Sequence, residues 1–583
     1  MIFSSRLRAN EKLRAHIWKQ GARVERVLRI ISILVALFVL GYLVFFYGFP
    51  QTPQTAHFQK TILLFGLSFF CVKYLIKFFY ALHKTTYLKE SRLEGFIILF
   101  LILGFSQSSP LFLQFCFLIF FGIEISKASS FLVKYKISAP VLMIGAFLIL
   151  IGMGTLLLSL PQMTTHGISF IDALFTATSA GCVTGLTVLE TSTAFTLKGQ
   201  IVILGLVQLG GMSILSFTSF FVIFLSHSFA GLKYQSLMKD FLSSNKLSDT
   251  KVLFRQIFVF SITIEIIGAV LLYGYWSNSG DLTSKQSFFF AVFHSVSAFN
   301  NAGFSLFTEN FHNSVVAHAY FPQTILMILI ILGGLGFLCL RDFIDISFIK
   351  ERKRYRWKKI QPNTKIAVYM TFVIIVVSSV ILFFIEYNNS AFSEQKNIFE
   401  RIFASVFQVV SCRTAGFNSV NLSLLGVPAL LLMILIMFIG ASPGSTGGGI
   451  KTTTFFVLLK SASATIKNKK QIEFDKRSIP FSIVDRAYAI VLFSVSIIFI
   501  SIFVISIFEP EYLLSDIFFE TVSAFSTAGA STGIIGDFGV TSKFILILNM
   551  FIGRIGPITI ALALSRKVYY TKYSYANTFV MVG

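Results

Sequence analysis

One pattern occurs four times along this chain and limits its fold more than any other feature. A long apolar segment is followed by a shorter apolar stretch, then by small and polar residues that end in a glycine, and then by a second long apolar segment. The four glycines are Gly185, Gly303, Gly416 and Gly529. Their spacing of roughly a hundred residues is typical of an internal structural repeat. We therefore expect four related units from about Ser138 onward.

The short apolar stretch of each repeat cannot cross a membrane. It has about a dozen residues, and because a helix rises about 1.5 Å per residue it spans about half of the hydrocarbon layer. The chain must then turn back. Non-helical backbone is tolerated at that depth only where protein buries it or where it lines a water-filled cavity. The four glycine-bearing loops are therefore predicted to face a shared axis.

The composition indicates an all-α integral membrane protein. Of the 583 residues, 55% are hydrophobic and 13% are charged, and a soluble core does not need so much apolar sequence. A spanning helix needs about 20 residues, and several segments have that length, among them the one that starts at Arg29. We expect that segment to be the first true span rather than a cleaved signal peptide, because no small-residue cleavage site follows it.

The formal net charge of +23 is distributed in a way that predicts the topology. Alternate connections are rich in Lys and Arg, namely the N-terminal arm and the regions 84–92, 127–136, 233–255, 350–365, 460–486 and 566–572. This follows the positive-inside rule and predicts a multi-pass protein of the cell membrane with both termini in the cytoplasm. No soluble domain carries the charge, so nucleic acid is not an expected partner, whereas anionic membrane lipid is.

Other function classes lack their expected residues. The five cysteines show no CxxC spacing, so neither a disulfide framework nor a zinc site is indicated. The spans contain no H-E-x-x-H motif and no nucleophile elbow, so we do not expect an enzyme. An inverted-repeat transporter of organic solutes would show two related halves with broken helices, and four loop-bearing repeats argue against it.

The chemistry of the loops suits a dehydrated cation. Backbone carbonyl groups can replace the hydration shell of an ion without fixed negative charge. Glycine adopts positive φ at little cost and allows close approach of backbones, and a short helix that points its C-terminal end at the axis adds the negative end of its dipole. One such glycine alone is as well explained by a tight turn. Four in equivalent places favour a ring.

The loops resemble a known family. "CVTGL" from Cys182, "NNAGFS" from Asn300, "CRTAGFN" from Cys412 and "AFSTAG" from Ala524 are similar to the four pore loops of the Trk/Ktr/HKT superfamily of potassium transporters, in particular the Ktr and Trk membrane subunits. The resemblance covers roughly Ser138 to Tyr575. It implies four repeats of span, pore helix and span with pseudo-fourfold symmetry around a central pore. The filter residues that it implies are Cys182, Val183, Thr184, Gly185, Asn301, Ala302, Gly303, Thr414, Ala415, Gly416, Thr527, Ala528 and Gly529.

The resemblance also implies an ion and partners. K⁺ would be the transported ion, because Gly185 stands where sodium-favouring relatives carry serine, and Na⁺ is left open as a stimulating ion or as the permeant ion of a related pathway. Small residues flank Gly529 in "STAGAS", where relatives carry larger ones, which leaves the ion preference open. Relatives form homodimers and dock on cytoplasmic nucleotide-binding regulatory subunits. We expect no organic cofactor in this chain, and the basic loops at 350–359 and 467–477 are candidate docking surfaces or solvated loops.

The second span of the third repeat is interrupted by "GASPGSTGGGIK" from Gly440 to Lys451. Clustered glycines and a proline cannot sustain one continuous helix. Ile450 separates the last glycine from the lysine, so the run is not a phosphate-binding loop. The alternatives are a break that accommodates its neighbours and the gate that the resemblance implies. The gate residues implied are Gly440, Ser442, Gly444, Ser445, Thr446, Gly447, Gly448, Gly449, Lys451 and, from the last span, Arg554.

Charged residues inside the membrane are costly and usually face the protein interior. We expect Arg554 to raise a barrier to cations and to contact the gate loop. Arg413 should point away from the axis, since a cation in the ion path would repel potassium, and we hypothesise that it pairs with Glu520 of a pore helix. Other charges, Lys73, Lys77 and Glu265, are expected to snorkel or to pair within the bundle.

The repeats and an N-terminal extension divide the chain. We place the extension at 1–137, with about four transmembrane segments, since the third apolar stretch is broken by "SQSSP" and an even number of spans is needed before the first repeat. The expected repeats are 138–235, 250–347, 360–461 with the gate loop, and 482–575. The sequence assigns the extension no role beyond packing against the pore bundle.

Overall fold

The computed structural model describes residues 24, 27–80, 84–103, 109–128, 139–212, 249–278, 280, 283–312, 316–355, 360–389 and 397–564. Most of these residues are helical, and the one sheet among them is a two-stranded hairpin. Several predicted features lie outside the described residues. They are the N-terminal arm, most of the basic regions 127–136 and 233–255, the second half of repeat 1 beyond Met212, and the C-terminal basic region.

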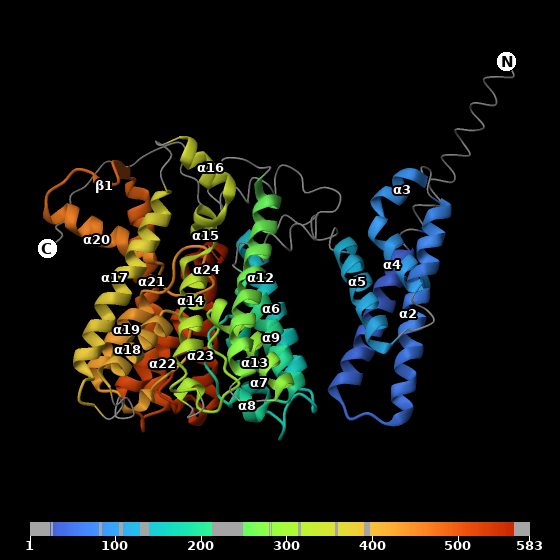
Figure 1. Ribbon diagram of the computed structural model, residues 1–583, viewed down its shortest axis with the longest axis horizontal. Coiled ribbons are helices and arrows are strands. Elements are labelled where there is room, and N and C mark those ends of the chain that lie inside the picture. The colour runs from blue at the N-terminus through green and yellow to red at the C-terminus, as the bar shows by residue number, and fades with distance from the viewer. Residues whose placement is uncertain are drawn as a thin grey trace, which may run out of the picture.

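Six described helices are long and apolar enough to cross a membrane, or up to eight if each of two bent helix pairs is one span. Figure 1 shows the long helices of the repeats running side by side. The all-α membrane fold is thus confirmed.

The N-terminal extension forms a separate small bundle, drawn in blue at one edge of Figure 1. It consists of the helix Val27–Gly48 followed by α2 (Pro53–Tyr80), α3 (Lys84–Glu90), α4 (Arg92–Leu103) and α5 (Pro110–Ala128). The third apolar stretch contains two helices, α4 and α5, and neither is among the six described helices of membrane-spanning length. Val39, Leu67 and Phe117 are buried in the core of the bundle. It meets repeat 1 where the backbone N–H of Gln162 donates to the carbonyl of Gly48 over 3.0 Å.

Each repeat begins with a long helix and continues with a shorter pore helix. The long helices are α6 (Ala139–Leu158), α12 (Asp249–Trp276), α17 (Pro362–Ile385) and α21 (Phe481–Phe508). The pore helices are α7 (Phe170–Gly181), α13 (Ser284–Phe299), α18 (Ile398–Cys412) and α22 (Leu514–Ser526). Local sequence sets their starts: Ser169 caps α7, and Thr283 with Gln286 and Asn397 with Glu400 form capping boxes that satisfy the first N–H groups of α13 and α18.

The second spans are less regular than the sequence predicts. They begin with α9 (Leu197–Gly211), α14 (Tyr320–Leu335), α19 (Val427–Phe438) and α23 (Val540–Ile555). We expected a break in repeat 3 alone, but α14 meets α15 (Phe337–Ile344) at 102° and α23 meets α24 (Pro557–Leu564) at 89°. The reason is a glycine at each bend: Gly336 has φ 85° and Gly556 has φ 93°, values that a continuing helix cannot contain.

The remaining elements are short and peripheral. They are α8 (Thr191–Ala194), α16 (Ile346–Arg354), α20 (Thr452–Ile466), the 3₁₀ turns Asn310–His312, Leu422–Leu424 and Ile534–Asp537, and strands β1 (Ile472–Phe474) and β2 (Arg477–Ile479). Figure 1 places the pore helices in the lower half of the bundle and α16 with the hairpin at the opposite end. The two ends of the molecule are therefore built differently.

Candidate functional site

The four glycine-bearing loops meet in a closed ring. Each glycine lies so close to the next loop that an added Cβ would come within 3.0 Å of the carbonyl oxygen of the residue before that loop's own glycine. The four contacts are Gly185 with Ala302, Gly303 with Ala415, Gly416 with Ala528, and Gly529 with Thr184. Segments that are far apart in the sequence are thus neighbours in order around one axis.

The four loops also share one backbone conformation. The glycines have φ values of 91°, 69°, 76° and 80° in chain order. The residue two positions before each glycine also has positive φ, namely Val183 (57°), Asn301 (58°), Thr414 (74°) and Thr527 (50°). Positive φ is rare in β-branched residues and persists only where the surroundings impose it. Such strain in equivalent places is typical of a functional site.

The end of each pore helix leads directly into the ring. The backbone N–H groups of Thr184, Ala302 and Ala528, each one residue before the glycine, donate to the carbonyl of a serine five residues earlier, Ser179, Ser297 or Ser523, over 2.7 to 2.9 Å. In loop 3 the N–H groups of Ala415 (2.8 Å) and Gly416 (3.2 Å) both donate to the carbonyl of Ser411, which lies five rather than six residues before its glycine. Because the C-terminal ends of four helices converge there, their dipoles favour a cation in the ring.

All of the predicted filter residues are buried in the structure. None of them carries a charged side chain. The amide of Asn301 and the hydroxyl of Thr414 lie 3.2 Å apart and join loops 2 and 3. Within the described part of the chain no group of His, Cys, Asp and Glu side chains could hold a metal ion. Where neighbouring loops approach each other most closely, the groups that line the contact are backbone carbonyls.

The predicted pair of Arg413 and Glu520 is wrong. The guanidinium of Arg413 donates to the hydroxyl of Thr371 in α17 over 3.2 Å, behind its own loop. Glu520 accepts hydrogen bonds from the residues after Gly529 in its own loop instead. Loop 3 turns Arg413 outward toward the first span of its repeat. Only the expectation that this arginine points away from the axis agrees with the structure.

Two other intramembrane charges are paired within the bundle, as expected. Lys73 forms an ion pair with Glu124 and also donates to Ser32 over 2.9 Å, which ties three helices of the extension together. Glu265 accepts from the side-chain amides of Gln208 (3.1 Å) and Asn300 (3.0 Å). Asn300, the C-cap residue of α13, is thereby bonded to α12, the first span of its repeat.

The interrupted segment of repeat 3, residues 439–451, lies directly beneath the ring. We call it the gate loop. An added Cβ on Gly447 would strike Thr414, and the N–H of Gly448 donates to the hydroxyl of Thr527 over 3.0 Å. Loops 3 and 4 thus rest on this segment through the side chains of two positive-φ threonines. The sequence shows no sign of these two contacts.

The gate loop also touches the other repeats. The N–H of Ser442 donates to Gly334 of α14 over 3.0 Å, and the N–H of Phe337 donates back to Gly444 over 3.1 Å. Arg554 of α23 donates to the carbonyl of Thr446 in the gate loop and to the carbonyl of Gly210 in α9. The loop is therefore held by repeats 2 and 4, and Arg554 extends the contact to repeat 1.

The gate loop is closed on itself as well. Lys451 donates to the carbonyl of Gly447 over 2.7 Å, and Ile439 and Ile450 form a β-bridge that brings its two ends together. The Cα of Gly440 lies so close to Gly448 that a Cβ would not fit. The predicted gate residues are thus one compact unit, with Arg554 against it.

Glycines of the second spans allow this close assembly, although they are not among the predicted site residues. In α9, α14 and α23, a Cβ on Gly210, Gly333 or Gly553 would strike the carbonyl at the end of the adjoining pore helix. The signal was present as the doublets Gly210–Gly211 and Gly333–Gly334. In repeat 4 the second member of the doublet is replaced by Arg554, so one arginine stands where two other repeats carry glycine.

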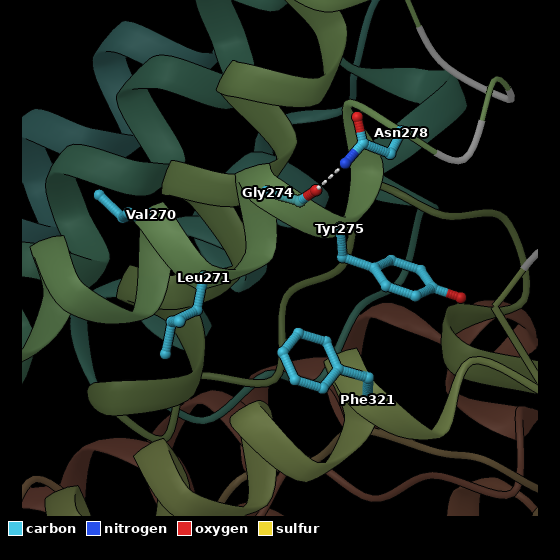
Figure 2. Close-up of a pocket in the computed structure, with 6 residues that line it drawn as sticks. All are labelled: Val270, Leu271, Gly274, Tyr275, Asn278 and Phe321. Atoms are coloured by element: carbon cyan, nitrogen blue, oxygen red, sulfur yellow. Dashed lines mark hydrogen bonds between the residues drawn. The ribbon is translucent and has the colours of Figure 1, made fainter.

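Two cavities lie away from the ring. One of about 520 Å³ opens beside α12 and α14 and is lined by Val270, Leu271, Gly274, Tyr275, Asn278 and Phe321 (Figure 2). Figure 2 shows the side-chain amide of Asn278, two residues beyond the end of α12, bonded to the carbonyl of Gly274 in that helix. The other, of about 750 Å³, lies between α17, α19 and α20. Neither includes a residue of the ring.

Comparison with known proteins gives the same family as the loops. The Ktr system potassium uptake protein B of Bacillus subtilis is 39% identical over 435 residues, which cover 73% of this chain and 92% of that protein. The protein of the same name from Vibrio alginolyticus is 35% identical, and the match covers 77% of this chain and 96% of that protein. The potassium/sodium uptake protein NtpJ of Enterococcus hirae is 33% identical, and the match covers 77% of this chain and 98% of that protein.

A solved structure agrees on the fold. The crystal structure of the potassium transporter TrkH from Vibrio parahaemolyticus matches with a TM-score of 0.59 at 16% identity, covering 92% of this chain and 98% of that one. A match over 92% of this chain must include part of the N-terminal extension. Part of the extension therefore also has a counterpart in the fold of TrkH, although the sequence resemblance begins only near Ser138. A family model described as TrkH, cation transport protein, matches residues 112–573 and so begins within α5. The chain belongs to the TrkH family of cation transport proteins.

Proposed function

We propose that this protein mediates potassium uptake across the cell membrane through the ring of four loops. The observation that carries the proposal is the closed ring of positive-φ glycines, in which each glycine lies against a carbonyl of the next loop. Rings of carbonyl groups replace the hydration shell of a cation. The names of the Bacillus and Vibrio relatives support potassium as the ion. The filter residues are the thirteen that the sequence analysis names.

The gate loop is proposed to open and close the path beneath the filter. It rests on Thr414 and Thr527 of two filter loops and is held by Arg554. A glycine-rich segment can take up a second backbone conformation at little cost. A buried guanidinium below the ring also raises the energy of a cation there. Movement of the loop would displace the loop itself and the guanidinium that it binds, Arg554, from the path together.

Sodium has two candidate roles, as a stimulating ion or as a transported ion. Sodium could stimulate potassium uptake, or the same ring could pass sodium itself, and the name of the Enterococcus relative, a potassium/sodium uptake protein, supports keeping the second candidate. Gly185 in the first loop favours potassium. A measured ratio of sodium to potassium uptake separates these candidates.

The orientation and the partners are proposals as well. Helix α16 ends in Arg352, Lys353 and Arg354, and Figure 1 places it with the β1–β2 hairpin at the end opposite the pore helices. Basic residues stay cytoplasmic, so we place this end and both termini in the cytoplasm. There a nucleotide-binding regulatory subunit would dock on a homodimer, with the hairpin region 467–477 as one contact. Anionic lipid would neutralise the remaining basic charge.

The repeat boundaries 138–235, 250–347, 360–461 and 482–575, after an extension at 1–137, stay part of the proposal.

The test is rescue of a potassium-uptake-deficient bacterium at low external potassium. The wild-type chain should restore growth and rubidium uptake, and Gly416→Ser should restore neither or should lose the preference for potassium over sodium. A protein that is expressed and inserted but moves neither potassium nor rubidium would overturn the proposed function. An unchanged preference in Gly416→Ser would remove Gly416 from the filter.

A further inference from the structure

The pore helices carry a buried polar side chain at one equivalent position. The serines Ser179, Ser297, Ser411 and Ser523 align the helices, because the carbonyl of each accepts the N–H of the residue before the filter glycine. One helical turn before these serines, three residues earlier, stand Thr176, His294, Gln408 and Glu520. All four are at most 2% exposed. A buried polar group without a partner is costly, and each of these four side chains makes at least one hydrogen bond.

Three of the four accept the same backbone hydrogen bond. The N–H of the third residue after the filter glycine donates to the pore-helix side chain in repeats 2, 3 and 4. The bonds are Leu306 to Nε2 of His294 (3.3 Å), Ser419 to Oε1 of Gln408 (3.4 Å) and Thr532 to Oε1 of Glu520 (2.7 Å). An imidazole, an amide and a carboxylate thus make one contact in three repeats.

The side chain of the second residue after the glycine joins the same contact. The hydroxyl of Ser305 lies 3.2 Å from Nε2 of His294, and the hydroxyl of Ser531 donates to Glu520 over 2.8 Å. In repeat 3, the amide of Gln408 donates to Oδ1 of Asn418 over 3.3 Å. Each loop is therefore fastened at two consecutive residues just beyond its glycine.

The first loop is held differently. The hydroxyl of Thr176 donates to the carbonyl of Asp172 in its own helix over 2.8 Å. The N–H of Gly185 itself donates to the hydroxyl of Ser179 over 3.1 Å. The chain thus contains its own comparison, one loop without the side-chain fastening beyond the glycine and three loops with it.

We propose that His294, Gln408 and Glu520 are positioning residues that set the ion preference of the ring. This proposal rests on the proposed function, because it assumes that the ring is the filter. Each side chain holds the second and third residues after the glycine of its loop, which we call the outer limb of the loop. By holding the outer limb, it also fixes the position of the glycine and of the carbonyl that faces the next loop. A ring whose limbs can shift accommodates ions of different size, so loss of one fastening lowers discrimination before it prevents folding.

Glu520 makes the strongest of the three contacts. One oxygen, Oε1, accepts from the N–H of Thr532, the hydroxyl of Thr532 and the hydroxyl of Ser531, over 2.7 to 2.9 Å. The other oxygen, Oε2, is buried and has no hydrogen-bond partner. A glutamine can keep Oε1 as an acceptor in the same place, whereas a leucine of similar size cannot. This pair of substitutions separates the hydrogen bond from the volume of the side chain.

The test measures rubidium uptake into proteoliposomes and its competition by sodium. Glu520→Leu should increase inhibition by sodium about tenfold, and Glu520→Gln should stay within about threefold of wild type. Thr176→Val is the matched control at the equivalent position and should match wild type. Gln408→Leu should change the preference in the same direction as Glu520→Leu.

The outcomes distinguish failure of the positioning role from failure of the proposed potassium uptake through the ring. Wild-type protein that takes up no rubidium would overturn the proposed function. A wild type that prefers potassium, together with Glu520→Leu and Gln408→Leu that keep its preference, would overturn the positioning role alone. So would equal loss in the leucine variants and in Thr176→Val. If Glu520→Leu does not fold, as judged by thermal unfolding, Gln408→Leu decides.

Discussion

The ring of filter loops and the layer beneath it are built on opposite plans. In the ring, four different sequences adopt one backbone conformation, with positive φ at the glycine and two residues before it. In the layer below, the described second spans differ: α14 and α23 bend at a glycine, whereas repeat 3 supplies the gate loop. Surrounding an ion requires equivalent groups, whereas opening a path requires one element that can move against the rest.

The ring should be intolerant of a side chain at any of its four glycines. Gly303→Ala and Gly416→Ala each add a Cβ at positive φ, and that Cβ lies 2.5 Å or 2.9 Å from a carbonyl of the next loop. Strain and clash together should lower rubidium uptake about a hundredfold. Gly205→Ala in α9, where a Cβ meets nothing within 4 Å, is the control and should transport normally. Full rubidium uptake in either ring variant would show that the four glycines are not equivalent in excluding a side chain.

The gate loop should limit the rate without setting the preference among ions. Deleting residues 443–447 removes its contact with Thr414 and its hold on Arg554. Uptake of rubidium should rise about tenfold, the effect of a lower barrier beneath the ring. Competition by sodium should stay as in wild type, because the carbonyls are untouched. A deletion variant that loses potassium preference would show that the two layers act as one.

Arg554 should contribute a smaller share of the same barrier. Arg554→Gln removes the charge and weakens the hold on Thr446 and Gly210, and should raise uptake about fivefold. Arg554→Lys keeps the charge but cannot reach both carbonyls as a planar fork does, so it should lie between Gln and wild type. Combining Arg554→Gln with the gate-loop deletion separates the two roles. Additive effects would mean that the charge acts directly on the ion.

The extension should matter for stability and hardly for transport. Lys73→Met leaves the buried carboxylate of Glu124 without its ion pair and should cost about 3 to 5 kcal/mol of unfolding free energy in that bundle. Replacing both residues, by Met and Leu, should recover most of the loss. Thermal unfolding in detergent measures the change, and rubidium uptake at low temperature should remain within about twofold of wild type. A large transport defect would give the extension a role in the pore.

The sequence predicts the ring better than it predicts its surroundings. Short apolar stretches followed by glycine imply a re-entrant loop, because helix rise and membrane thickness leave no other solution. The same reasoning finds the break between Gly440 and Lys451. It does not find the bends at Gly336 and Gly556, although the sequence carries a signal at each: Gly336 follows the doublet Gly333–Gly334, and Pro557 follows Gly556.

Pairing between distant residues is harder still to predict. Arg413 and Glu520 were natural partners by charge, but Arg413 bonds to the hydroxyl of Thr371 instead, and Glu520 bonds to hydroxyl and N–H groups of its own loop. His294, Gln408 and Glu520 share one contact and no chemical type, so their equivalence emerges only when the loops are superimposed by their serines. Gln408 lies eight residues before its glycine, whereas His294 and Glu520 lie nine before theirs, which hides the equivalence further.

The most direct test of the ring as a filter is to locate the ion. Anomalous diffraction from crystals of the transport-competent protein in rubidium should show density on the axis, surrounded by the carbonyl oxygens of Thr184, Ala302, Ala415 and Ala528. Rubidium density that is absent from this ring while the same protein preparation takes up rubidium, or that lies beside Glu265 or Glu520 instead, would contradict the account.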